Sequence, residues 1–209
     1  WTRPEAPVRI TITGEDGSIV ACYEEQAPDT LKMPPDRPPM PLAAEIQSAD
    51  ELYLAGVHVD QYRDPSVMPD AYWLEALRRN PRHIPSLLGM ARYSYQMLRL
   101  PEARDYAERA VEALTVFNER AESGEAYYLY ALILEAQGEY KAAYDNYYKA
   151  AWNEDSVSKA MVRLACLDLR MGNPKEAARH AAWAEKHNAL HPLAPAVRML
   201  ARPEHAAEI

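Results

Sequence analysis

Apolar side chains recur at helical spacing along most of this 209-residue chain, with short polar breaks between successive runs. Capping signals agree with these runs, because Ser48 opens a capping box and Asn173 is a suitable N-cap for a helix that begins at Pro174. The pattern predicts helices over residues 49–62, 67–79, 83–98, 101–117, 123–137, 140–152, 156–171, 174–187 and 192–201.

Residues 8–13 and 18–23 instead alternate branched apolar and polar side chains, which is typical of half-buried strands. The sequence GEDG at residues 14–17 provides turn chemistry, so the two runs predict a β-hairpin. A lone hairpin is marginally stable in water. We therefore expect residues 1–27 to be the remnant of a preceding β domain, with packing on the helices or pairing with another copy as the alternatives.

Six prolines lie between residues 28 and 41, and they exclude a continuous helix or a central strand there. We interpret residues 28–47 as a Pro-rich, semi-rigid linker. The PxxP spacing at residues 35–38 leaves open a second interpretation, a ligand for a proline-recognising domain. The linker would lead into a helical domain over residues 48–203, followed by a short tail over residues 204–209.

A small–large–small triplet of side chains returns in the second helix of successive helix pairs. Its leading positions are 34, 40 and 34 residues apart, which indicates an internal repeat with about six extra residues near 117–122. Two antiparallel helices approach closely only where side chains are small, and the larger residue fills the remaining space. The triplets are Pro69, Trp73 and Ala76; Ala103, Ala107 and Ala110; Ala143, Tyr147 and Ala150; and Ala177, Ala181 and Ala184.

This arrangement resembles the tetratricopeptide repeat, a helix–turn–helix unit of 34 residues. The resemblance implies an all-α fold, a right-handed α-solenoid of about four helix pairs plus a capping helix. Each pair leaves an apolar face that the next pair must cover.

Three longer stretches resemble the C-terminal repeat region of large bacterial proteins with an uncharacterised β-rich N-terminal domain. They are ADELYLAGVHVDQYRDP at residues 49–65, YWLEALRRNP at 72–81 and GEAYYLYALILEAQGEYKAAYDNYYKAAWN at 124–153. The resemblance covers about residues 20–203 and implies that the hairpin and linker lead out of that β domain. Because the chain starts at Trp1, we expect the natural protein to be longer. Such parents are often linked with sugar metabolism, but no catalytic residue carries over.

The composition and charge of the chain exclude some classes of binding partner. The net charge of −8 is spread along the chain, without the basic stripe that binding to nucleic acid or an anionic membrane needs. No run approaches the length of about 18 apolar residues typical of a membrane span. Cys22 and Cys166 lie far apart in the sequence, which favours reduced thiols and a cytoplasmic location.

Catalytic motifs are missing from the sequence, which has no Walker loop, GxSxG, CxxC or dinucleotide fingerprint. His187 and His191 have i, i+4 spacing, but Pro192 suggests that the helix has ended there, and no metal site is predicted. We therefore expect no enzyme activity and no cofactor.

In solenoids of this type, partners bind on the concave surface formed by the first helix of each pair, which we call the groove. The candidates there mix Tyr, aliphatic and Arg side chains, which suits an extended or helical protein segment. The Arg side chains fit an acidic ligand or, alternatively, pair within their own helices. The Lys and Asn clamp for a C-terminal carboxylate, carried by the best-known peptide-binding members, is missing. The groove candidates are Arg92, Tyr95, Tyr128, Leu132, Glu135, Val162, Arg163 and Arg170.

The sequence thus predicts a protein–protein or interdomain interaction scaffold. Its partner is a protein or peptide, or the missing N-terminal domain of the same chain, and the chain's own linker is a further occupant to consider. The alternatives are a non-catalytic accessory region of a larger carbohydrate-active enzyme and a homo-oligomerisation module. The latter would use exchanged hairpins or an outer apolar patch predicted at Tyr144, Tyr148 and Trp152.

Overall fold

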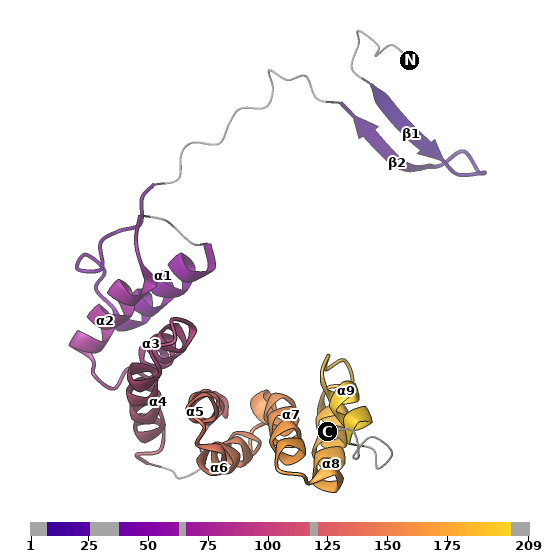
Figure 1. Cartoon of the computed structure of the whole chain (residues 1–209). Coiled ribbons are helices and arrows are strands. Elements are labelled where there is room, and N and C mark those ends of the chain that lie inside the picture. Colours follow the sequence, from indigo (N-terminus) through magenta and orange to yellow (C-terminus); the bar gives the residue numbers. More distant parts are fainter. Residues whose placement is uncertain (1–7, 26–37, 63–65, 118–120, 202–209) are drawn as a thin grey trace. The chain divides into compact units, whose positions relative to one another are not determined.

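The computed structural model describes residues 8–25, 38–62, 66–117 and 121–201, which belong to two compact units (Figure 1). The first unit spans Trp1–Pro39 and the second Met40–Ile209. The PxxP motif, the centre of the predicted insertion at 118–120 and the tail at 204–209 lie wholly or partly outside the described residues.

The first unit contains the predicted hairpin. β1 (Arg9–Thr13) pairs antiparallel with β2 (Ile19–Glu24), in a register that places Ile10 opposite Tyr23. The turn depends on two local features. The carboxylate of Asp16 accepts hydrogen bonds from the N–H and hydroxyl of Ser18, and Gly17 has a φ of +79°, which glycine adopts without a steric cost. The origin of this hairpin in a larger β domain stays a prediction.

The second unit is helical, and its helix boundaries differ from the predicted ones by no more than three residues. The helices are α1 (Ala49–Tyr62), α2 (Pro69–Arg79), α3 (Ile84–Gln96), α4 (Leu100–Leu114), α5 (Glu125–Ala136), α6 (Tyr140–Ala150), α7 (Glu154–Arg170), α8 (Pro174–His187) and α9 (Ala194–Leu200). The connection from α4 to α5 is longer than those from α2 to α3 and from α6 to α7, which agrees with the predicted insertion.

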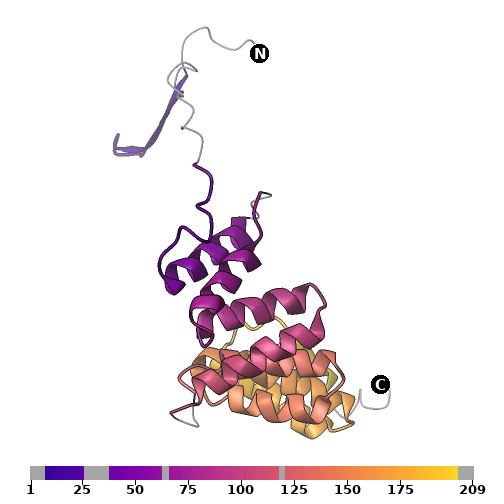
Figure 2. The same ribbon diagram turned by 90° about the vertical axis from the view of Figure 1, so that its left-hand side faces the viewer.

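Consecutive helices pack against one another as four antiparallel pairs, α1–α2, α3–α4, α5–α6 and α7–α8, with α9 packed on α8. Within this unit α1, α3, α5 and α7 form one layer, and α2, α4, α6 and α8 form the other (Figure 1). The pairs follow one another in chain order (Figures 1 and 2). The helical unit is therefore an all-α solenoid, as predicted.

The small–large–small triplets lie in the core. All twelve side chains are buried, and the nine alanines among them have no exposed surface. The small side chains allow close approach of the paired helices, and the few large ones, such as Tyr147, fill the space between pairs. At Ala107, where no large side chain is present, Leu129 and Ile133 of α5 belong to the same buried cluster.

Trp73 is packed closely against two glycines. Its ring lies between Gly56 of α1 and Gly89 of α3, and its indole N–H donates to the carbonyl of Tyr53 at 3.2 Å. A Cβ on Gly56 would overlap Trp73 Nε1, and one on Gly89 would lie 2.9 Å from Trp73 Cε2. Both glycines are therefore required by the indole ring and not by their own backbone angles.

Polar side chains link points of the chain about one repeat apart. Each pair joins residues 32–35 positions apart, which is close to the repeat length, so the same kind of contact recurs along the solenoid. The pairs are Asp50–His83, Arg92–Glu125, Arg104–Glu139, Ser123–Asp155, Tyr148–His180 and Glu154–His187.

In the described residues no helix pair precedes α1 and α2, and residues 40–47, which we call the N-terminal strap, pack on this first pair. Met40, Ala43 and Ile46 pack on the cluster that contains Leu52 and Tyr72. The sequence assigned this segment to a linker. The structure instead includes it in the helical unit, where it covers part of the apolar surface of the first helix pair.

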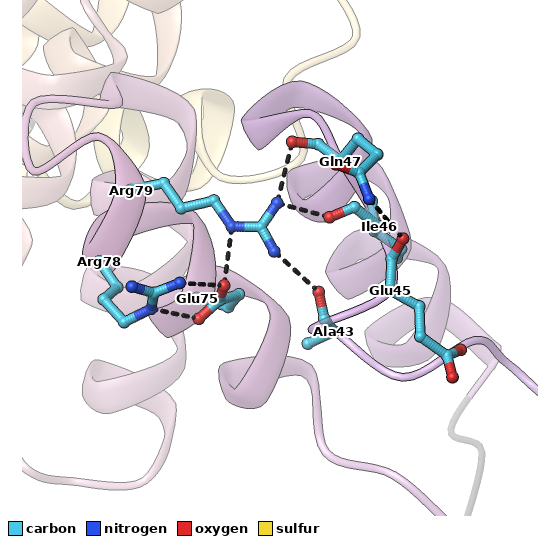
Figure 3. Close-up of polar contacts among 7 residues, drawn as sticks. All are labelled: Ala43, Glu45, Ile46, Gln47, Glu75, Arg78 and Arg79. Carbon is cyan, nitrogen blue, oxygen red and sulfur yellow. Dashed lines mark hydrogen bonds and ion pairs between the residues drawn. The ribbon is translucent and has the colours of Figure 1, made fainter.

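Arg79 fixes the strap to the C-terminal end of α2 (Figure 3). Its guanidinium donates to the carbonyls of Ile46 at 2.5 Å, Gln47 at 2.9 Å and Ala43 at 3.4 Å. Glu75 accepts a further hydrogen bond from Arg79 Nε at 2.7 Å, which holds the guanidinium group in position. Hydrogen bonds from Arg78 and Arg79 lower the pKa of Glu75 to about 2, so its carboxylate is ionised at neutral pH.

Arg79→Ala is expected to lower the free energy of unfolding by roughly 1.5–3 kcal/mol, the range for hydrogen bonds to a charged group. Arg78→Ala is the matched control, because Arg78 pairs with the same carboxylate but does not reach the strap, and an exposed ion pair of this kind contributes little to stability. Chemical denaturation measures both variants. Equal losses of stability in the two variants would show that the hydrogen bonds from Arg79 to the strap contribute nothing to it.

Gly56→Ala is expected to destabilise the protein by about 1–3 kcal/mol in spite of alanine's better helix propensity, because the added methyl overlaps the Trp73 indole. In a Trp73→Phe background, which removes the atoms that collide, the same change should cost much less. Thermal unfolding of the four proteins in this double-mutant cycle gives the coupling. An unchanged cost in the Phe background contradicts the steric explanation.

Candidate functional site

A pocket of about 350 Å³ lies on the layer of first helices, between α3, α5 and α7. Four of the predicted groove residues, Arg92, Tyr95, Tyr128 and Leu132, are among the residues that line it. Four further lining residues were not predicted, namely Gln96, Glu125, Leu129 and Lys159. The pocket therefore brings together the first half of the predicted groove.

Tyr128 forms the central wall of the pocket. The Lys159 ammonium lies 4.8 Å from the centroid of the Tyr128 ring, and the centroid of the Tyr147 ring lies 5.7 Å from it. Burial raises the pKa of the Tyr128 phenol, so the group is neutral at physiological pH. The wall is thus aromatic and uncharged, with a cation over the face of its ring.

Beyond the pocket, Glu135 connects the groove to the core. Its carboxylate accepts hydrogen bonds from Arg163 Nη2 at 2.5 Å and Arg163 Nε at 3.1 Å, and one from the hydroxyl of Tyr147 at 2.7 Å. Burial and the bond to Glu135 raise the pKa of Tyr147, which keeps the phenol protonated as a donor. Burial opposes the charge on Arg163, but the bonds to Glu135 outweigh it and raise the pKa of Arg163.

Val162 does not line the groove, contrary to the prediction, because it is only 1% exposed and packs in the core. The side chain that α7 contributes to the pocket is Lys159, which lies one turn before Arg163 on the same face of the helix. Arg170 is exposed at the far end of α7, where its guanidinium lies 4.3 Å from the centroid of the Tyr140 ring. Arg170 is not among the residues that line the pocket.

Arg92 and Arg163 each form an ion pair with a carboxylate on another helix, so the alternative of pairing within their own helices is wrong for these two. Arg92 of α3 forms an ion pair with Glu125 of α5, and Arg163 of α7 pairs with Glu135 of α5. These ion pairs hold adjacent repeats together along the groove. They also leave the cations of the groove in fixed positions.

The predicted outer patch is wrong for Tyr144 and Tyr148, which are partly buried against α7 and α8. The hydroxyl of Tyr144 donates to Asp168 at 3.0 Å, and that of Tyr148 lies 2.6 Å from His180 Nε2. His180 Nδ1 lies 2.6 Å from the second oxygen of Asp168, which closes a buried polar network. Trp152 alone is largely exposed, at 53%.

Asp155, in the first turn of α7, joins the start of α7 to the start of α5. Its carboxylate accepts hydrogen bonds from the Ser123 hydroxyl at 2.6 Å and the Gly124 N–H at 3.2 Å, just before α5. Partial burial disfavours ionisation of Asp155, but these two bonds outweigh it and lower its pKa. The contact sets the register of α5 against α7 and hence the spacing of Tyr128 and Lys159.

One cluster has the outline of a hydrolase triad. His83 Nδ1 lies 2.8 Å from the Ser86 hydroxyl, and His83 Nε2 lies 2.9 Å from Asp50. Ser86 is completely buried, so no substrate reaches its hydroxyl, and the cluster serves to join α1 to α3. The cysteines Cys22 and Cys166, both within the described ranges, are free thiols.

The described ranges contain neither a cluster of metal-ligating side chains nor a membrane-spanning helix. No group of three or more His, Cys, Asp or Glu side chains in them has the arrangement of a metal site. Across the same ranges, no helix is long and apolar enough to span a bilayer.

Solved structures similar to this chain are helical-repeat proteins. The MamA protein superposes with a TM-score of 0.62 at 18% sequence identity, over 77% of this chain and 85% of MamA. YrrB, a TPR protein with an unusual peptide-binding site, gives a TM-score of 0.60 at 17% identity, over 77% of this chain and 82% of YrrB. No protein-family model matches the chain. The helical unit thus has the tetratricopeptide-repeat type of α-solenoid fold.

Asp155→Asn is expected to lower the free energy of unfolding at pH 7 by about 1 kcal/mol, as for other side chains that satisfy an N–H at a helix start. The folded-state pKa of Asp155 is depressed, so its stabilisation is complete above the ordinary value of 3.8 and is lost as pH falls through the folded-state pKa. The variant should therefore lose less stability than the wild type between about pH 5 and pH 2. Denaturation at several pH values, with the exposed Asp145→Asn as control, tests this. Parallel pH profiles for Asp155→Asn and the wild type contradict it.

Proposed function

We propose that this protein is a non-catalytic interaction scaffold that holds a segment of a partner protein on the layer formed by α3, α5 and α7. The pocket around Tyr128 is the observation that carries the proposal. Its walls combine two tyrosines, two leucines and fixed polar groups, which is the composition expected of a surface that anchors side chains of a partner.

The size and lining of the pocket favour a protein segment over a small-molecule substrate. A volume of about 350 Å³ is at the lower end of the range for ligand cavities, and the pocket is open to the groove. It accommodates one or two large side chains of a bound segment, whose backbone would run along the groove. The peptide-binding site in the name of YrrB, a protein with the same type of fold, gives independent support.

The partner is a segment of another protein or of the N-terminal part of the same natural chain. The resemblance to the C-terminal repeat region of large bacterial proteins supports the second source. Two free thiols support a reducing compartment, and we place the protein in the bacterial cytoplasm.

Tyr128→Ala is expected to weaken partner binding at least about tenfold, because truncation of a central aromatic anchor typically costs 2 kcal/mol or more. Trp183→Ala is the matched control, since Trp183 is half exposed on α8, in the opposite layer. Partners are captured by cross-linking in cells of the source organism, purified, and titrated against the three proteins by calorimetry.

Equal affinity of a purified partner for wild type and Tyr128→Ala contradicts the proposed surface. Light scattering provides a separate check: a stable homo-oligomer that survives Tyr128→Ala and binds no other protein favours an oligomerisation module instead. A full-length natural protein whose glycan turnover needs these repeats but not Tyr128 favours the accessory-region alternative.

A further inference from the structure

The charge of the groove is opposite in sign to the charge of the whole chain. The chain carries a net charge of −8. The groove and its pocket contain the cations Arg92, Lys159, Arg163 and Arg170 and the carboxylates Glu125 and Glu135, and a third carboxylate, Asp155, lies one turn before Lys159 on α7. This one surface of an acidic protein therefore carries an excess of positive charge.

The three carboxylates already have hydrogen-bond or ion-pair partners, whereas two of the four cations have no ion pair. Glu125 pairs with Arg92, Glu135 accepts bonds from Arg163 and Tyr147, and Asp155 accepts bonds from Ser123 and Gly124. Lys159 and Arg170 form no ion pair with a carboxylate in the part of the chain that the structure describes, and each lies over a tyrosine ring. A ring face leaves most of the donors of a cation available to an anion.

The cations on α7 also share one face. Lys159, Arg163 and Arg170 are four and seven residues apart, which places them along a single side of the helix. Eleven residues of helix span about 16 Å, the length of about five residues of extended chain. Lys159 lines the apolar pocket, so the cationic strip begins where the aromatic wall ends.

We propose that the partner segment is acidic and carries a large apolar side chain next to Asp or Glu residues. The apolar side chain occupies the pocket between Tyr95, Tyr128 and Leu132. The neighbouring carboxylates bind Lys159 and, further along α7, the exposed donors of Arg163 and Arg170. This inference rests on the proposed function, because it names the class of segment that the same surface binds.

The negative charge of the rest of the protein adds specificity. An acidic segment is repelled by most of the surface and attracted by the groove, which raises the rate of correct encounters. Because the responsible groups are partly exposed, salt screens the attraction. Binding should therefore weaken as ionic strength rises, whereas binding driven by the apolar pocket alone would change little.

The test uses a phage-displayed library of random twelve-residue peptides, selected on the wild-type protein. The most enriched peptide is synthesised in two forms, one unchanged and one with every Asp and Glu replaced by Asn and Gln. Both forms are titrated by fluorescence anisotropy, at low and high salt, against wild type, Lys159→Glu, Tyr128→Ala and Lys175→Glu. Lys175 is an exposed lysine on α8, so its variant has the same change of net charge outside the groove.

We expect enriched peptides with Asp or Glu beside an aromatic or large aliphatic residue. Neutralising the peptide and Lys159→Glu should each weaken binding about tenfold, while Lys175→Glu changes it less than about twofold. If the neutral peptide binds wild type equally well but loses affinity for Tyr128→Ala, acidic selectivity is overturned and the groove function stands. If no peptide is enriched, or Tyr128→Ala binds the enriched one as wild type does, the proposed function fails as well.

Discussion

The close approach of the two helices in each repeat is the constraint on which the rest of the structure depends. Alanines such as Ala143, Ala150 and Ala177 are completely buried because the neighbouring helix backbone leaves room for nothing larger. This contact holds each pair as one rigid unit. The first helices of successive pairs are thereby brought side by side, and a pocket shared by three of them, lined by residues between Arg92 and Lys159, becomes possible.

Tyr147 shows how the core and the groove are coupled. Its ring is the large member of the third triplet and is fully buried, yet its hydroxyl reaches Glu135, which in turn holds Arg163 on the groove surface. The same residue therefore sets the packing of a repeat and the position of a groove cation. Any change that shifts the packing of α6 would also move the electrostatic surface presented to a partner.

The helices, triplets and part of the groove were predictable because they follow from local period and from the repeat frame. Tyr144 and Tyr148 were misplaced because their environment depends on Asp168 and His180, which come from other helices and carry no signal that links them in the sequence. Val162 was wrong because a one-position error in the frame turns a side chain by about 100° around the helix, from groove to core.

The strap has a consequence for how force enters the repeats. Its carbonyls are held by Arg79, which lies more than thirty residues further along the chain, at the end of α2. Tension on the chain before Met40 would load the Arg79 side chain and α2 before it reached the first turn of α1. The first repeat thus has a mechanical anchor that spreads a pull over two helices.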